Sequence, residues 1–251
     1  MSKLHNFLDG GYSFLEGGFP YSQGVIAGSG FAFKRVRFLK PIPIDEGFSW
    51  IEDHLAKAGR PLTALAACEL RSPTAFTLQA FQDFNINYVA TLKKWGIFRN
   101  NLNPIARSNL APQFNPPNKP SFYAFTYTVT DKSEDPKDWV IAGSGEWPED
   151  QPFPQGIIAR GDLTPSGITS KARYVLNTMQ ERAKGLEANW SRLTATQIYT
   201  VHNIAHLIEP EFAVRGLLGP GLCWHLCRPP IEELAFEMDV HSIKHNYVAS
   251  I

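Results

Sequence analysis

The sequence is poor in cysteine and carries no excess charge of either sign. Its 251 residues include three cysteines, Cys68, Cys223 and Cys227. An odd and sparse set of this kind excludes the disulfide framework of a small secreted protein and favours a reducing cytoplasm. Basic and acidic residues number 24 each, so the formal net charge is zero. That balance argues against nucleic acid or an anionic membrane as a partner, but it leaves room for a local basic site.

Long apolar runs are also absent from the sequence. No stretch approaches the roughly 18 consecutive apolar residues that a transmembrane helix needs. Residues 1–6 lead into glycine-rich sequence without the apolar segment of a signal peptide. Hydrophobic residues make up 43% of the chain and charged residues 19%, which is typical of a well-buried globular protein. We therefore expect a soluble, cytoplasmic protein.

What the sequence does contain is a repeated hexapeptide. Val-Ile-Ala-Gly-Ser-Gly occurs at residues 25–30 and again at residues 140–145. An apolar run followed by Gly-Ser-Gly is typical of a buried strand that enters a tight turn. Residues 131–138, between the two copies, are polar, charged and without periodicity, as in a linker. These observations predict two homologous domains, at residues 1–133 and 138–251.

Apolar periodicity predicts a similar order of elements in both halves. In the first half we expect strands at 24–33, 36–39, 65–70 and 122–129, with helices at 48–58 and 81–95. In the second half we expect strands at 139–144, 156–160, 196–201, 222–226 and 234–243, with helices at 166–189 and 208–216. This order indicates an α+β fold in which helices pack on one face of a mixed sheet.

Short strings along the chain carry a resemblance to a known family. In the first half these are Pro-Tyr-Ser-Gln-Gly-Val at 20–25, Asp-Phe-Asn-Ile-Asn-Tyr at 83–88 and Ile-Ala-Arg-Ser at 105–108. In the second half they lie at 140–145, 161–162, 169–177 and 227–239. Together they resemble motifs of the RidA (YjgF) family of imine and enamine deaminases. The resemblance implies two tandem RidA-like (chorismate-mutase-like) domains, each a mixed β-sheet with helices on one face.

The same resemblance implies roles for two residues. Arg107 matches the arginine that holds the substrate carboxylate, and Glu237 matches the glutamate that positions the hydrolytic water. Each half keeps one of the pair, because Gly221 stands where the second arginine would fall and residues 122–125 replace the other glutamate. We therefore expect a composite site between unlike halves, with further substrate contacts from Tyr21, Ser22, Asn85 and Cys223.

These residue types suit the hydrolysis of an imine carboxylate. Arginine binds a carboxylate through two parallel, charge-assisted hydrogen bonds. A partly buried carboxyl group with a raised pKa can deliver water and move its proton. No metal or organic cofactor is required, because the imine carbon is already electrophilic. Other interpretations stay open: Arg107 as a surface arginine, Glu237 on the solvent face of a strand, and Tyr21 as a packed aromatic residue.

The cysteine and histidine residues do not predict a metal site. Cys223, His225 and Cys227 alternate on one face of an expected strand. The outer two would stand roughly 13 Å apart in a strand, which is too far for one tetrahedral ion. His202 and His206 would converge only on a helix, and the surrounding sequence predicts a strand end and a turn.

The expected function is a cofactor-independent hydrolytic deaminase that acts on an enamine or imine carboxylate, such as 2-aminomuconate or a chlorinated analogue, and releases ammonia. A dicarboxylic substrate would need a second cation, for which Arg228, Arg173 and Lys94 are candidates. Because small members of the RidA family form trimers with sites between subunits, we expect a homotrimer or a hexamer. Two alternatives stay open: a chorismatase-like hydrolase on the same fold, and a non-catalytic module that binds a small molecule.

Overall fold

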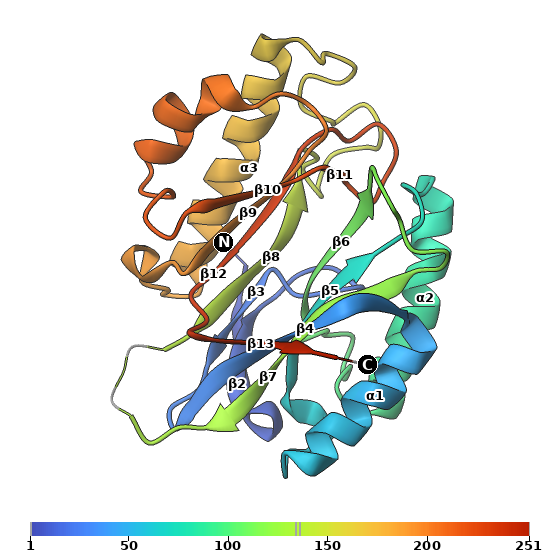
Figure 1. Ribbon diagram of the computed structural model, residues 1–251, viewed down its shortest axis with the longest axis vertical. Helices are drawn as coiled ribbons and strands as arrows, with labels where there is room; N and C mark the ends of the chain where they lie inside the picture. The colour runs from blue at the N-terminus through green and yellow to red at the C-terminus, as the bar shows by residue number, and fades with distance from the viewer. Residues whose placement is uncertain (1, 134, 136, 251) are drawn as a thin grey trace.

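The computed structural model describes residues 2–133, 135 and 137–250. In this part of the chain two β-sheets lie face to face, and helices cover their outer sides (Figure 1). The seven-stranded sheet has the order β1 (Leu4–Phe7), β2 (Tyr12–Leu15), β3 (Gly24–Ala27), β8 (Trp139–Gly145), β12 (Glu237–His241), β9 (Ala195–Tyr199) and β10 (Leu222–His225). The six-stranded sheet has the order β11 (Cys227–Arg228), β6 (Ala106–Pro112), β5 (Leu65–Arg71), β7 (Ser121–Thr130), β4 (Phe31–Pro43) and β13 (His245–Ala249).

The three longest helices are α1 (Ile44–Lys57), α2 (Leu78–Lys94) and α3 (Pro165–Gly185). Capping hydroxyl groups fix where two of them begin, since Thr77 accepts a hydrogen bond at the start of α2 and Thr164 at the start of α3. Helices α1 and α2 pack on the six-stranded sheet and α3 packs on the seven-stranded sheet (Figure 1). Short helical turns span Leu8–Gly10, Leu62–Ala64, Trp190–Arg192 and Ala205–Leu207, and a π-helix spans Ile208–Ala213. Among the described residues, no helix combines the length and apolarity needed to cross a bilayer.

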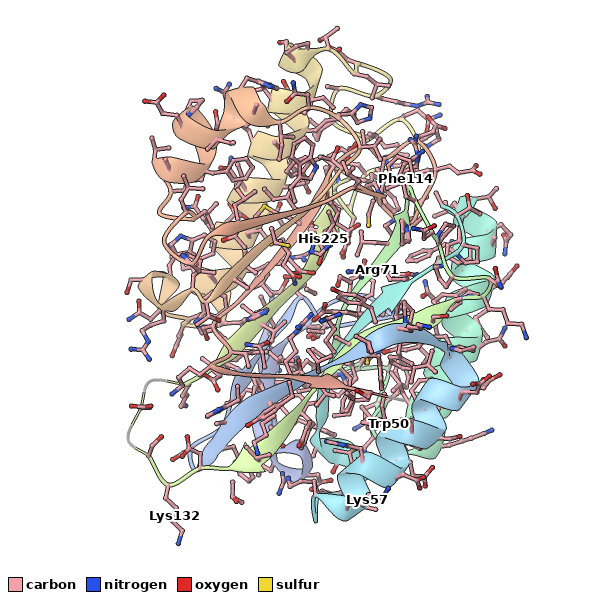
Figure 2. The ribbon with its side chains drawn as sticks, viewed as in Figure 1. Trp50, Lys57, Arg71, Phe114, Lys132 and His225 are labelled. Atoms are coloured by element: carbon pink, nitrogen blue, oxygen red, sulfur yellow. The ribbon has the colours of Figure 1, made fainter. Side chains whose placement is uncertain are left out.

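The layer between the two sheets mixes small, aromatic and polar side chains. Its buried apolar members are Tyr12, Phe14, Val25, Ala27, Phe33, Ala66, Ala67, Ala106, Ala142 and Ile243. Figure 2 shows that Arg71 and His225 also lie near the middle of the molecule, whereas Lys57 and Lys132 lie at its edge. The many alanines allow the two sheets to approach closely, and the polar residues of this layer build the site described below.

The prediction of tandem RidA-like domains is wrong. Strands β1, β2 and β3 of the N-terminal half belong to the same sheet as β8, β9, β10 and β12, while β11 and β13 of the C-terminal half join the other sheet. The repeated hexapeptides pair with each other, because Val25 lies opposite Val140 in the antiparallel ladder of β3 and β8. Apolar patterns indicate which residues form a strand but not which strands pair. The two halves, although they look alike in sequence, therefore do not form separate sheets. The boundary between residues 133 and 138 stays a prediction, and residues 134 and 136 of the expected linker lie outside the described residues.

Most of the individual elements are confirmed, with altered ends. Helices α1, α2 and α3 and strands β5, β7, β8, β9, β10 and β12 all overlap the predicted ranges. One expectation is wrong, because residues 156–160 form turns rather than a strand. The weak helix predicted at 208–216 is present as a short π-helix at Ile208–Ala213. The terminal strands β1, β2 and β13 were not predicted. Strand β13 pairs parallel with β4, which is far away in the sequence.

A fully buried ion pair fixes the start of β12. Lys171 of α3 lies with its Nζ 3.3 Å from Glu146 Oε1, and neither side chain is exposed. The carboxylate of Glu146 also accepts hydrogen bonds from the backbone N–H groups of Ala235 and Phe236, at 2.6 and 3.1 Å. Glu237 is the next residue along the chain, so the Glu146–Lys171 pair fixes the backbone from which the Glu237 side chain extends.

We predict that Lys171→Met lowers the free energy of unfolding by about 3–5 kcal/mol, because it leaves a buried carboxylate without its partner. The measurement is the urea midpoint followed by circular dichroism. Lys184→Met is the matched control, because Lys184 is an exposed lysine on the same helix, and it should change stability by no more than about 0.5 kcal/mol. Equal stability of the two variants would contradict the role of the ion pair.

Candidate active site

A cavity of about 510 Å³ lies between the two sheets and is closed by residues of α2, α3 and the loops around them. Most of its wall is apolar and aromatic, with Phe19, Phe81, Trp147, Ile231 and Leu234 among the lining residues. The ionisable and amide side chains on the wall are Tyr21, Gln82, Asn85, Arg107, Asn109, Glu149, Arg182 and Glu237. An apolar pocket with a few convergent polar groups is typical of a small-molecule site.

Arg107 lies on β6 with 2% of its surface exposed. Its Nη2 donates a hydrogen bond to Asn85 Oδ1 at 2.7 Å, and its guanidinium lies 5.0 and 4.8 Å from the ring centres of Tyr21 and Tyr88. Within the described residues, Nη1 of Arg107 is buried without a hydrogen-bond partner. A buried donor left unpaired costs about 1–3 kcal/mol, so this edge of the guanidinium is suited to an anionic ligand.

Glu237 is the first residue of β12 and is 4% exposed. Burial raises its pKa well above the usual 4.5, and the charges of Asp239 and Glu146 raise it further, while Arg107 and Arg182 act in the opposite direction. Burial therefore favours the neutral form of this side chain, which can donate a proton. This environment, a buried carboxyl group between other carboxylates and arginines, is typical of a catalytic acid.

Gly143 makes room for the Glu237 carboxyl group. A methyl group added at Gly143 would overlap Glu237 Oε1 and would lie 2.9 Å from Ser108 Cβ. Gly143 belongs to the second hexapeptide, and it lies inside β8 rather than in the tight turn that the sequence predicted. The glycine is required here for close approach of two sheets and not for a left-handed backbone conformation.

Of the predicted substrate contacts, the structure brings Tyr21 and Asn85 to the cavity together with Arg107 and Glu237. Ser22 is fully buried behind the wall, and its hydroxyl donates to the carbonyl oxygens of Pro104 and Gly24 at 3.2 and 3.4 Å. Cys223 lies on the edge strand β10, exposed to solvent and away from the residues that line the cavity. Its Sγ lies 3.3 Å from His225 Nε2.

Arg182 is a cavity residue that the sequence did not predict. It lies on α3, is 6% exposed, and donates from Nη1 to the carbonyl oxygens of Ala142 and Gly143 at 3.1 and 3.4 Å. A signal was present, because Arg182 follows Met179 by three residues and therefore falls on the apolar stripe of the helix. A charged residue on that stripe is expected to have a buried partner.

The three cations suggested from the sequence for a second carboxylate do not line the cavity. Arg228 on β11 is exposed and donates to Gln113 Oε1 at 3.2 Å. Arg173 pairs with Glu211 at 2.5 Å, and Lys94 is exposed at the end of α2. Arg182 is instead the second arginine on the wall.

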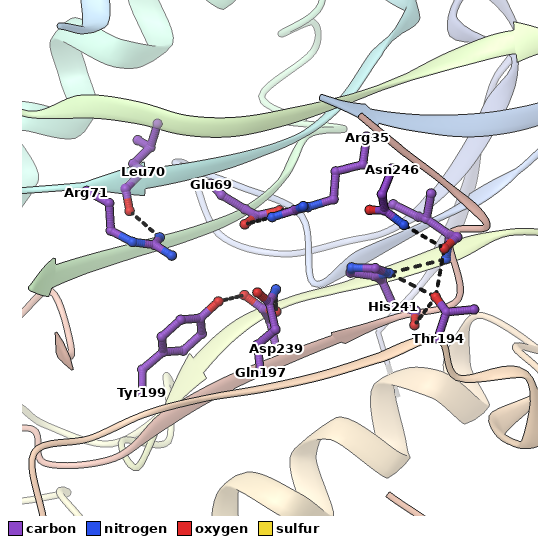
Figure 3. A network of polar contacts seen from close by, with 11 residues as sticks. Arg35, Glu69, Leu70, Arg71, Thr194, Gln197, Tyr199, Asp239, His241 and Asn246 are labelled. Carbon is purple, nitrogen blue, oxygen red and sulfur yellow. Dashed lines mark hydrogen bonds and ion pairs between the residues drawn. The ribbon is translucent and has the colours of Figure 1, made fainter. Parts of the chain in front are cut away.

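A network of polar side chains extends between the two sheets from Asp239, two residues beyond Glu237 (Figure 3). Asp239 accepts hydrogen bonds from Gln197 Nε2 and Tyr199 OH at 2.7 and 2.9 Å. Burial and the charge of Glu69 raise its pKa to about 6. Burial would also raise the pKa of Glu69, but the charge and hydrogen bonds of Arg35 outweigh this and lower it to about 2. The charge of Asp239 in this network raises the pKa of Glu237 and favours its protonated form.

Possible metal ligands are dispersed over the fold. Across residues 2–133, 135 and 137–250, no three histidine, cysteine, aspartate or glutamate side chains are grouped so that they could hold a metal ion. Of the trio singled out in the sequence, Cys223 and His225 lie on β10, whereas Cys227 lies on β11 of the other sheet.

Comparison with known proteins places the chain in a family. Residues 4–247 match the family described as 2-aminomuconate deaminase CnbZ. The chain belongs to this family. A curated relative, the 2-amino-5-chloromuconate deaminase of Comamonas testosteroni, is 43% identical over 236 residues, which cover 93% of this chain and 94% of the relative.

Two solved structures are similar to this member of the 2-aminomuconate deaminase family. A chorismatase matches with a TM-score of 0.54 and 11% identity, covering 87% of this chain and 77% of its own. This likeness shows a shared fold alone. A cyanuric acid hydrolase from A. caulinodans covers 84% of this chain and 66% of its own, but its TM-score of 0.40 at 10% identity is too low to argue from. The resemblance to the RidA family stays a prediction from short motifs.

We predict that Gly143→Ala lowers kcat by about 10²-fold, because the added methyl group displaces the Glu237 carboxyl group and a 1 Å misplacement of a catalytic group can cost that much. Ammonia release at saturating substrate measures the effect. Gly219→Ala is the control, because a methyl group there meets nothing within 4 Å. Normal turnover of the Gly143 variant would show that Glu237 does not need its present position.

Proposed function

We propose that the chain is a deaminase of 2-aminomuconate or a chlorinated analogue, and that the reaction takes place in the cavity of Arg107 and Glu237. The observation that carries this proposal is the presence of both side chains on one cavity wall, in a member of the 2-aminomuconate deaminase family. The relative in Comamonas testosteroni, named for a 5-chloro analogue of the same substrate, supports a dicarboxylic enamine.

Substrate binding in this proposal begins with Arg107. Its free Nη1 and its Asn85-bound Nη2 face a carboxylate beside the amino-bearing carbon, and charge-assisted hydrogen bonds fix that group. Tyr21 and Tyr88 stack against the guanidinium and hold its plane. Because Arg107 is buried among aromatic side chains, the interaction is stronger than it would be at the surface.

Glu237 acts first as an acid. The neutral carboxyl group donates its proton to a chain carbon of the enamine, where the electron pair of the C=C bond forms the new C–H bond. The lone pair of the nitrogen forms the C=N bond at the same time, so the substrate becomes an iminium ion. Glu237 becomes a carboxylate, which the nearby Arg107 and Arg182 stabilise.

Glu237 then acts as a base. Water adds to the iminium carbon and gives its proton to the carboxylate, which produces a carbinolamine. Glu237 passes this proton to the amine nitrogen, the C–N bond breaks, and the hydroxyl proton returns to Glu237 as the C=O bond forms. The products are ammonia and a 2-oxo acid, and the enzyme is again in its starting state. The steps as proposed use protein groups and water alone.

The other expectations from the sequence stay predictions. These are the cytoplasmic location and a homotrimer or hexamer. The proposed site takes Arg107 and Glu237 from a single chain, so it does not itself require a neighbouring subunit. A chorismatase-like activity is separated by assay, because it would release pyruvate from chorismate instead of ammonia from 2-aminomuconate.

We predict that Arg107→Ala lowers kcat/KM by roughly 30- to 1000-fold, because a charge-assisted carboxylate contact is lost. Arg107→Lys should recover only part of this loss, since an ammonium group lacks the fork of the guanidinium. Initial rates of ammonia release from 2-aminomuconate measure both variants. The exposed Arg192 gives the control Arg192→Ala, which should behave as the unchanged protein. Near-normal kcat/KM in the Arg107→Ala variant would remove Arg107 from the site.

We predict that Glu237→Gln lowers kcat by about 10²–10⁴-fold, the usual contribution of a positioned acid or base. In the unchanged protein kcat/KM should be highest with Glu237 protonated. It should fall as the pH rises through the pKa of this residue, which burial holds well above the usual 4.5. The variant should lose this limb of the pH profile. Glu232→Gln, an exposed neighbour, is the control. An unchanged limb in the Glu237 variant would assign the proton transfer to another group.

A further inference from the structure

Arg182, the second arginine of the cavity, has an Nη2 group that is available to a ligand. Nη1 of Arg182 is bound by the carbonyl oxygens of Ala142 and Gly143, which anchor the guanidinium to β8. Nη2 lies 3.8 Å from Glu149 Oε1, beyond hydrogen-bonding distance. The guanidinium is thus anchored at one edge, while Nη2 at its other edge lies 3.8 Å from the Glu149 carboxylate.

Glu149 is a weak partner for this arginine. Its side chain is 50% exposed, whereas that of Arg182 is 7% exposed. An ion pair with one exposed member and no direct hydrogen bond contributes little, because water screens the charge and holding the side chain costs entropy. A ligand carboxylate that forms direct hydrogen bonds with Nη2 would therefore displace Glu149.

Arg182 and Arg107 act on the same part of the cavity. Both lower the pKa of Glu237 and of Tyr21 through their charges, so both lie close to these two side chains. Besides the buried Glu237, the acidic and basic groups on the wall are the two arginines and Glu149. The apolar residues Phe81, Ile231 and Leu234 line the same space. This arrangement fits an apolar chain that carries a carboxylate at each end.

We infer that Arg182 forms a second carboxylate subsite, which binds the end of a dicarboxylic ligand that Arg107 does not hold, and that Glu149 occupies this subsite in its absence. The inference rests on the proposed function for the identity of the substrate, but not for the binding itself. Arg182 is in this role a specificity-determining residue that selects dicarboxylates over monocarboxylates. Glu149 is the competitor that a ligand must replace.

The test compares two unreactive six-carbon diene acids by isothermal titration calorimetry. cis,cis-Muconate carries two carboxylates and sorbate carries one. The unchanged protein should bind muconate more tightly than sorbate. Arg182→Gln should weaken muconate binding by about 10- to 100-fold, the value of a hydrogen bond to a charged group, and should leave sorbate binding within about two-fold. Arg228→Gln, the same change at an exposed arginine outside the cavity, should alter neither.

The inference is overturned if the unchanged protein does not prefer muconate, or if Arg182→Gln weakens both acids equally or neither. If this variant does not fold, Glu149→Gln decides the matter, because it changes an exposed side chain. It should tighten muconate binding by about two- to five-fold, which is the scale of a weak exposed ion pair, without a change for sorbate. Unchanged or weaker muconate binding in that variant would overturn the inference. Ammonia release from 2-aminomuconate by the unchanged protein tests the proposed function separately.

Discussion

The burial of the Glu237 carboxyl group between two sheets is the constraint on which the site depends. A charged carboxylate would be costly in this place, so burial and the neighbouring Asp239 raise the pKa of the group and favour its protonated form. Two features of the fold make the burial possible. Gly143 leaves the space that the carboxyl group fills, and the Glu146–Lys171 pair holds the backbone just before it. In the proposed reaction, Arg107 and Arg182 offset the negative charge that forms when the proton leaves.

The same constraint explains why the two halves of the chain are interleaved. Arg107 lies on β6 of one sheet and Glu237 on β12 of the other, so the cavity exists only where the sheets meet. The N-terminal strands β1 to β3 extend the sheet of β12, and β11 and β13 extend the sheet of β6. Each sheet therefore contains strands from both halves of the chain. The likeness to a chorismatase structure shows this fold alone.

Local structure could be predicted from the sequence, whereas the assembly of the sheets could not. The 3.6-residue period identified α1, α2 and α3. Short motifs predicted Arg107, Asn85 and Glu237 as site residues, and all three line the same cavity. The repeated hexapeptide was misleading, because identical strings have different roles in the two halves. In the first copy the strand ends at Ala27, and Gly30 adopts a positive φ in the turn that follows. In the second copy the strand continues to Gly145, and Gly143 lies inside it against Glu237. A single sequence does not show which strands pair, and so the predicted domain arrangement was wrong.

The omission of Arg182 has a different physical reason. Arginine on a helix is usually solvated, and only its place on the apolar stripe of α3 distinguishes it from its exposed neighbours. Ser22 and Cys223 were selected from motifs that position residues by sequence alone. Ser22 lies buried behind the cavity wall, and Cys223 lies on the edge strand β10. Side-chain direction at strand ends depends on the sheet that forms, which the sequence did not specify.

The most direct measurement is the titration of the Glu237 carboxyl group by ¹³C NMR, with glutamate labelled at the side-chain carboxyl carbon. The unchanged protein should show one carboxyl signal that titrates well above the usual glutamate range of roughly 4–5, and this signal should be missing from Glu237→Gln. Its midpoint should coincide with the falling limb of the kcat/KM profile. If the signal assigned to Glu237 titrates within the usual range, the carboxyl group is charged at neutral pH and cannot be the acid that starts the reaction.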